Sequence, residues 1–291
     1  MKIEATTLSI VTGSRACNAR CPYCVSKMTP SFGMEKELPV VDWRAFEAAC
    51  RYSRAHGITT ALFTGKGEPT LFPQQITTFL SVLRQHEFPL IELQTNGIVF
   101  EDDDFQNRYL ETWKYFGLTS VCLSIGDIEP ENNARLMTDN KPKFNWNESC
   151  RILKQHSFMV RVSCVICKGH VDNVDRLKKL VEVCRDLKVD QLTVRELGEP
   201  EETWKGQHVK QWVDKHKVCS AEAGLEEFLC KKGTELLRLP HGAVVYDLND
   251  QNVCLNNCLT YPSKDGEIRQ LIFCPDNHLR YDWQKSGALI F

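Results

Sequence analysis

The sequence predicts an α/β fold built on a parallel β-sheet, and two observations support this. Six short apolar segments rich in β-branched residues alternate with amphipathic stretches between residues 8 and 195, which is typical of repeated βα units. Each apolar run is nearly continuous, as expected for a strand that helices cover. With 291 residues, 42% hydrophobic and 25% charged, the chain is long enough to bury one large core.

The six predicted strands share this apolar character. They are Leu8–Thr12, Thr60–Thr64, Ile91–Thr95, Ser120–Ser124, Val160–Val165 and Gln191–Arg195. The amphipathic stretches between them predict helices. These are Val41–His56, Pro73–Gln85, Asp104–Phe116, Asn145–Gln155 and Val171–Leu187. In the last helix, apolar residues recur at helical spacing with charged residues opposite, so it has a core face and a solvated face.

The alternation stops after Gly198, where Glu199-Pro200-Glu201 marks a boundary. We expect a barrel domain over residues 1–198 and a smaller α+β cap over residues 199–291. The cap elements predicted from the pattern are helices and short strands. They are Trp204–His216, Ala221–Lys232, Glu235–Leu239, Ala243–Tyr246, Ile268–Phe273 and His278–Trp283.

Composition narrows the class of protein. The net charge of -2 and the absence of a Lys/Arg run give no electrostatic footprint for nucleic acid. No apolar run approaches the roughly 20 residues of a membrane span, and Met1–Ile10 lacks a signal-peptide pattern. We therefore expect a cytoplasmic protein with no membrane contact. Its fourteen cysteines are then buried thiols or ligands rather than disulfides.

Three cysteines lie close together in a C-x3-C-x2-C spacing, at Cys17, Cys21 and Cys24. Three thiolates can hold one four-iron cluster and leave one iron open, which can bind a small molecule and pass it an electron. Zinc is the alternative, but structural zinc needs four ligands. The next cysteine is Cys50, on a predicted helix.

Polar and glycine-rich segments follow the first four predicted strands. They contain the three cysteines, Gly65–Pro69, Asn96 and Ser124. In parallel β/α barrels, reactive groups collect at the carboxyl ends of the strands. Glycine lets the backbone approach a ligand closely and proline fixes the turn, so Gly65–Pro69 is a candidate ligand loop, although an ordinary turn also fits it.

These motifs resemble the radical S-adenosylmethionine (SAM) enzymes, whose hallmark is this cysteine loop with an aromatic residue, here Tyr23, before the third cysteine. The resemblance covers residues 7 to about 198. It implies a partial (β/α)6 TIM-like barrel and a [4Fe-4S] cluster held by Cys17, Cys21 and Cys24. The open iron would bind the amino and carboxylate groups of SAM.

The resemblance also implies the SAM contacts. Gly67, Glu68 and Pro69 would lie along the methionine amino group, and Ser124 would contact the ribose. The whole set of expected cofactor contacts is Tyr23, Gly65, Gly67, Glu68, Pro69, Asn96, Ser124, Ser163 and Leu197. A satisfied strand-end hydroxyl is the alternative for either serine. Lys66 departs from the double glycine that is usual in this family.

The implied reaction is reductive cleavage of SAM to a 5'-deoxyadenosyl radical, which abstracts hydrogen from substrate. The partners would be a small-molecule substrate, such as a nucleotide, or a peptide, and a low-potential electron donor such as a flavodoxin or ferredoxin. Two other functions stay open. They are activation of a glycyl-radical enzyme and a zinc-stabilised module that binds protein or RNA.

Two further sets of residues are candidates. Cys254, Cys258 and Cys274 are loosely similar to the tail cysteines of the GTP cyclases of molybdenum-cofactor synthesis and could hold a second cluster, although an ordinary hairpin also explains Cys274. Arg161 and Arg195 lie in the last two barrel strands and are candidates for substrate contact. Arg161 suits an anionic group, because the related cyclases have a basic residue there.

Overall fold

The structure is a computed structural model that describes residues 2–32, 34, 37–140, 143–200, 206–239, 242–256 and 267–291. Its centre is an 11-stranded sheet in the order β13-β12-β2-β3-β4-β5-β6-β7-β10-β9-β8. The six predicted strands are its middle and pair in parallel in chain order. They are β2 (Thr7–Val11), β3 (Thr60–Thr64), β4 (Leu90–Thr95), β5 (Ser120–Ile125), β6 (Met159–Ile166) and β7 (Gln191–Glu196). The predicted α/β class is confirmed.

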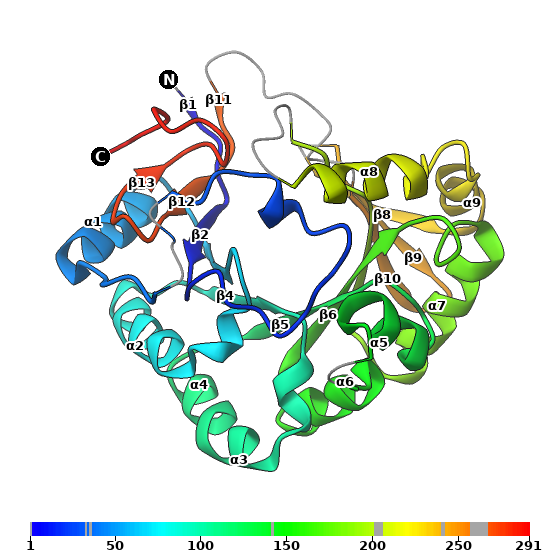
Figure 1. Ribbon diagram of the computed structural model, residues 1–291, viewed down its shortest axis with the longest axis horizontal. Helices are drawn as coiled ribbons and strands as arrows, with labels where there is room; N and C mark the ends of the chain where they lie inside the picture. The colour runs from blue at the N-terminus through cyan, green and yellow to red at the C-terminus, as the bar shows by residue number, and fades with distance from the viewer. Residues whose placement is uncertain are drawn as a thin grey trace.

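The sheet curves into a partial barrel with helices outside it (Figure 1). Alternation along the strands sets the two faces. On β6, Val160 and Val162 belong to the main hydrophobic core, so the intervening Arg161 and Ser163 face the barrel interior. On β7, Leu192 and Val194 belong to that core, and Arg195 lies on the inner face.

Most predicted helices are present with bounds close to the expected ones. They are α1 (Trp43–Ala55), α2 (Pro73–Leu83), α6 (Trp146–Gln155) and α7 (Val174–Asp186). Side-chain caps fix three of their starts. Asp42 accepts a hydrogen bond from Arg44 N at 2.9 Å, Asn145 accepts one from Asn147 N at 3.0 Å, and Asn173 accepts one from Arg176 N at 3.0 Å. Short 3-10 turns add to them: η1 (Val25–Lys27), η2 (Pro69–Leu71), η3 (Arg84–His86) and η4 (Ile98–Glu101).

Two helical regions differ from expectation. The predicted helix Asp104–Phe116 is divided into α3 (Asp103–Phe105), a π-helical turn η5 (Gln106–Leu110) and α4 (Glu111–Tyr115). An additional helix, α5 (Pro130–Thr138), follows β5. Its first residue is proline, which favours a helix start because the missing N–H is not needed there.

The segment after residue 205 adds strands to both edges of the barrel sheet. Next to β7 lie β10 (Gln251–Leu255), β9 (Val244–Leu248) and β8 (Thr234–Arg238), with β10 parallel to β7. Next to β2 lie β12 (Leu271–Phe273) and β13 (Leu279–Arg280). The other elements are α8 (Gln207–His216), α9 (Leu225–Lys232) and the pair β1 (Lys2–Ile3) and β11 (Glu267–Ile268).

Sequence analysis predicted the hairpin that carries Cys274 but not β10. A domain boundary near residue 198 stays a prediction. In the described part of the chain, no helix has both the length and the apolar character needed to cross a membrane.

Candidate functional site

The loop that follows β2 carries Cys17, Cys21 and Cys24 and projects over the barrel axis (Figure 1). Hydrogen bonds hold this loop at two points. Arg20 N donates to Met137 O of α5 at 2.6 Å, and Ala16 O accepts from Glu68 N at 2.9 Å. The three cysteines are therefore fixed at the carboxyl end of the strands.

The three thiols are close enough to affect one another. Burial, with smaller contributions from the neighbouring Cys24 and Cys17, raises the pKa of Cys21 to about 12. Burial likewise raises the pKa of Cys17 to about 11. Thiols in such surroundings become thiolates only when a metal supplies compensating positive charge.

The donor set of this loop is three thiols. Three thiolates can hold a [4Fe-4S] cluster and leave one iron open, whereas a structural zinc ion takes four ligands.

The second loop, Gly65–Pro69, packs directly against the cysteine loop. A Cβ atom on Gly67 would lie 2.0 Å from Ala16 O and 2.6 Å from Ser14 O, so only glycine allows this approach. The neighbouring Glu68 is buried, which raises its pKa. Its carboxylate accepts four hydrogen bonds that oppose this rise, from Thr70 N, Thr70 Oγ1, Thr95 Oγ1 and Asn96 N.

Asn96 joins the two loops. Its Nδ2 donates to Asn18 Oδ1 at 2.7 Å, and its Oδ1 accepts from Ile98 N at 3.0 Å. Its backbone N–H bonds Glu68 at 3.0 Å. The Asn96 side chain, expected to contact a cofactor, is therefore already engaged in holding the cysteine loop against Glu68.

Lys66, the residue that departs from the family pattern, points to the C-terminal segment. Its Nζ donates to Thr29 Oγ1 at 2.6 Å and lies 5.7 Å from the centre of the Trp283 ring. Burial lowers the pKa of Lys66 to about 8, while nearby Cys274 and Cys24 oppose this. The lysine thus connects the loop after β3 to the segment after β12.

The other expected SAM contacts lie on the inner face of the barrel. Ser124 and Ser163 are register partners on β5 and β6, and neither hydroxyl has a hydrogen-bond partner among the described residues. Tyr23 packs beside a buried group that contains Leu197, and its ring centre is 5.9 Å from that of Trp212 on α8. Tyr23 OH is buried without a hydrogen-bond partner.

The two candidate arginines differ. Arg161 is held by Glu92 of β4 through Nε at 3.0 Å and through a second contact from Nη2, and its Nη1 donates to Thr193 Oγ1 at 3.3 Å. Its charge is thus already neutralised. Nε of Arg195 is buried without a partner.

A buried acidic group that sequence analysis missed lies in the loop after β5. Asp127 contacts His170 Nδ1 at 2.6 Å and accepts from Arg176 Nη2 at 3.2 Å. Burial opposes ionisation, but these bonds and one from Glu129 N outweigh it and lower the pKa of Asp127. Its position directly after a barrel strand could have drawn attention to it.

Two of the three candidate ligands of a second cluster, Cys254 and Cys274, lie on different parts of the sheet. Cys254 lies on β10 and Cys274 follows β12, and six strands, β2 to β7, separate these two strands in the sheet. The two cysteines belong to separate hydrophobic groups. Cys258 lies outside the described residues.

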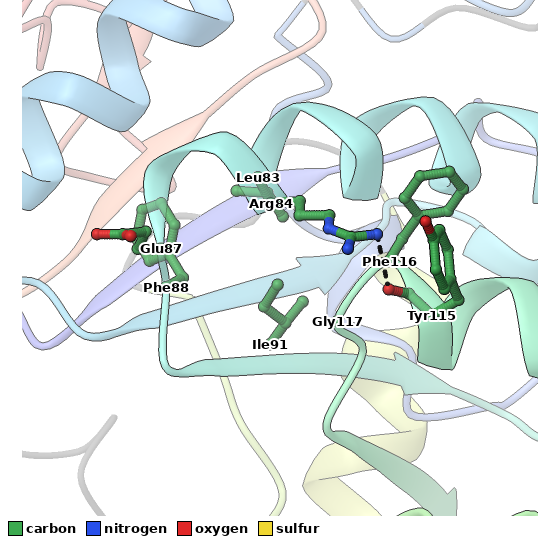
Figure 2. A pocket seen from close by; sticks show the side chains of 8 residues that line it. All are labelled: Leu83, Arg84, Glu87, Phe88, Ile91, Tyr115, Phe116 and Gly117. Carbon is green, nitrogen blue, oxygen red and sulfur yellow. Dashed lines mark hydrogen bonds between the residues drawn. The ribbon is translucent and has the colours of Figure 1, made fainter.

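A shallow pocket of about 180 Å³ lies on the opposite side of the barrel (Figure 2). It is lined by Ile91 and Gly117, next to the starts of β4 and β5, and Arg84 Nη1 donates across it to Tyr115 O at 3.2 Å. Because barrel enzymes act at the carboxyl ends of their strands, we do not assign the reaction to this pocket.

Residues 11–205 match the family model of the radical SAM superfamily. The chain belongs to this superfamily and is a radical SAM enzyme, and the family implies a [4Fe-4S] cluster and SAM. It is 26% identical over 180 residues to GTP 3',8-cyclase of Chlorobaculum tepidum, covering 62% of this chain and 49% of that protein. To GTP 3',8-cyclase of Mannheimia succiniciproducens it is 28% identical over 126 residues, covering 43% and 34%.

Solved structures support the fold. SuiB of Streptococcus suis bound to the precursor peptide SuiA aligns with a TM-score of 0.59 at 13% identity, covering 94% of this chain and 58% of SuiB. Native anSMEcpe with bound AdoMet aligns with a TM-score of 0.55 at 16% identity, covering 95% and 74%. The chain spans about half or less of the curated relatives it matches, and the partial TIM-like barrel is confirmed.

Proposed function

We propose that Cys17, Cys21 and Cys24 hold a [4Fe-4S] cluster at which this enzyme cleaves SAM reductively. When bound, such a cluster supplies the electron that converts SAM to methionine and a 5'-deoxyadenosyl radical able to abstract hydrogen from substrate. The observation that carries the proposal is the contact between the two loops: Gly67 packs on Ala16 at a distance that no side chain tolerates.

The chain's own groups are suited to bind and orient SAM. The loop at Gly67, braced by the hydrogen bonds of Glu68, presents backbone groups beside the cysteines for the methionine end. The Ser124 and Ser163 hydroxyls, without protein partners, are available for the ribose and the carboxylate. Tyr23 and Leu197 supply an apolar wall for the adenine, and this wall excludes water from a reactive intermediate.

The substrate we propose is a small molecule, such as a nucleotide, or a peptide, and the electron donor a flavodoxin or ferredoxin. The GTP cyclase relatives favour the first substrate class and the peptide-bound SuiB structure is compatible with the second. The zinc-stabilised binding module is not favoured, because the family model that residues 11–205 match is that of the radical SAM superfamily.

The test is anaerobic reconstitution with iron and sulfide. We expect a brown protein with about four irons per chain that releases 5'-deoxyadenosine from SAM when a low-potential reductant is added. Iron well above that content would indicate a second cluster on the tail cysteines.

Variants make the test specific. Cys17→Ser should lose the cluster and the SAM cleavage, whereas Cys219→Ser should keep both, because Cys219 is equally exposed but lies outside the motif. A Cys17→Ser protein that cleaves SAM at the wild-type rate would contradict the proposal.

A further inference from the structure

Two charged groups of the barrel interior and rim are paired with opposite charges, and Arg195 is not. Arg161 is neutralised by Glu92, and Asp127 by Arg176 and His170. Arg195 has no such partner. Among the described residues no carboxylate pairs with its guanidinium, and its Nε is buried without a hydrogen-bond partner.

Arg195 occupies a defined level of the barrel. Thr193, two residues earlier on the inner face of β7, is level with Ser163 of β6 and receives the hydrogen bond from Arg161. Leu197, two residues later, belongs to the apolar group at the rim. Along β7, Arg195 therefore lies between the level of the Arg161–Glu92 ion pair and the apolar group that contains Leu197.

Tyr23, Cys122 and Cys164 lie within the electrostatic reach of Arg195. None of these three side chains is a carboxylate that could pair with the guanidinium. Tyr23 OH, like Arg195 Nε, is buried without a partner. Two hydrogen-bonding groups thus share one region of the interior with no acceptor to satisfy them.

The Arg195 side chain is half-buried, and a buried donor such as its Nε is costly when it lacks a hydrogen-bond partner. Guanidinium donors match the planar or tetrahedral oxygens of carboxylate and phosphate, which they bind in bidentate fashion. We infer that Arg195, with Tyr23 OH beside it, is a subsite for an oxyanion of the substrate, either a carboxylate or a phosphate. This inference rests on the proposed function, since it names the substrate class of the same barrel.

The test is anaerobic calorimetric titration of the reconstituted enzyme with inorganic phosphate and, separately, with succinate, at constant ionic strength. We expect one of the two probes to bind at one site per chain. Arg195→Met should weaken that binding about ten- to hundredfold, the range of a charge-assisted hydrogen bond. Arg51→Met is the matched control, because the Arg51 side chain is 62% exposed, and it should bind like the wild type.

The probe that binds more tightly identifies the oxyanion. Arg195→Lys should give an intermediate affinity, because lysine keeps the positive charge but lacks the two parallel N–H donors of the guanidinium. Absence of binding to the wild type, or equal binding by Arg195→Met, would overturn the inference. So would a melting temperature of Arg195→Met well below that of the wild type, since it would mean that the protein itself pairs the guanidinium.

Failure of the proposed function is a separate outcome. It would appear as absence of 5'-deoxyadenosine in the wild type while anion binding still depended on Arg195.

Discussion

The two arginines inside the barrel lie on neighbouring strands of one sheet, yet their surroundings are opposite. Arg161 is held by Glu92 and Thr193, whereas Arg195 has no carboxylate partner among the described residues and has a buried, unbonded Nε. The first arginine is used by the protein's own structure, and the second is the one that we propose for a ligand. Residue type and strand alone therefore do not identify a substrate contact; the presence or absence of a protein counter-charge does.

The largest effect should come from breaking the locked pair. Arg161→Met leaves the Glu92 carboxylate, whose side chain is only 14% exposed, without its cation. We expect a loss of about 3–5 kcal/mol in the free energy of unfolding, measured with denaturant. Replacing Glu92 by Met as well should recover much of it, because the uncompensated charge is then gone. Equal stability of Arg161→Met and Arg195→Met would remove the contrast between the two arginines.

A smaller effect should follow from forcing the two loops apart. The methyl group of Gly67→Ala would overlap Ala16 O, so we expect a cost of about 1–3 kcal/mol from overpacking together with weaker SAM binding by calorimetry. Gly198→Ala is the matched control, because nothing lies within 4 Å of its added Cβ. If both variants bind SAM equally, the close approach of the loops has no part in the site.

Loosening the connection between Asn96 and Asn18 should cost less. Asn96→Ala removes the hydrogen bonds to Asn18 and Ile98, each worth about 1 kcal/mol. The expected result is a modest fall in melting temperature and a faster loss of the cluster during anaerobic gel filtration. Unchanged retention would show that the cysteine loop is held without this amide.

The smallest effect on stability is expected from Asp127, at the rim of the barrel, and only at acidic pH. The pKa of Asp127 is lower in the folded protein than in the unfolded chain, so its contribution to stability is complete above about pH 4 and is lost as the pH falls through the folded value. Asp127→Asn should therefore flatten the fall of unfolding free energy below pH 4. An identical slope in both proteins would mean that this carboxyl does not titrate differently on folding.

The barrel strands could be predicted because short β-branched apolar segments alternate with amphipathic stretches, and their observed bounds lie within one or two residues of the predicted ones. Strand β10 was missed because the sequence feature that marks it is the turn before it, not a continuous apolar segment. Asn249 and Asp250, which precede it, both have positive φ, as a two-residue hairpin turn requires. Its pairing with β7 is a long-range contact that no local pattern contains.

The candidate site was predictable where a short motif, such as ligand spacing or a glycine-rich turn, determines which residue is needed. The cysteine spacing and the glycines of Gly65–Pro69 point to loops that meet a ligand, and the structure does place these loops in contact. The partners of side chains were not predictable. Arg161 was favoured for an anion because related cyclases have a basic residue there, and nothing in the sequence shows that Glu92, 69 residues earlier, pairs with it. The roles of these residues toward SAM stay predictions.

The pairing of β12 with β2 has a consequence for how the molecule forms. Leu8 aligns with Leu271 and Ile10 with Phe273, so one edge of β2 pairs with β12, whose residues are synthesised more than 260 positions later. During translation that edge stays unprotected, and unpaired edges invite association between nascent chains. Contacts so distant along the chain also slow folding.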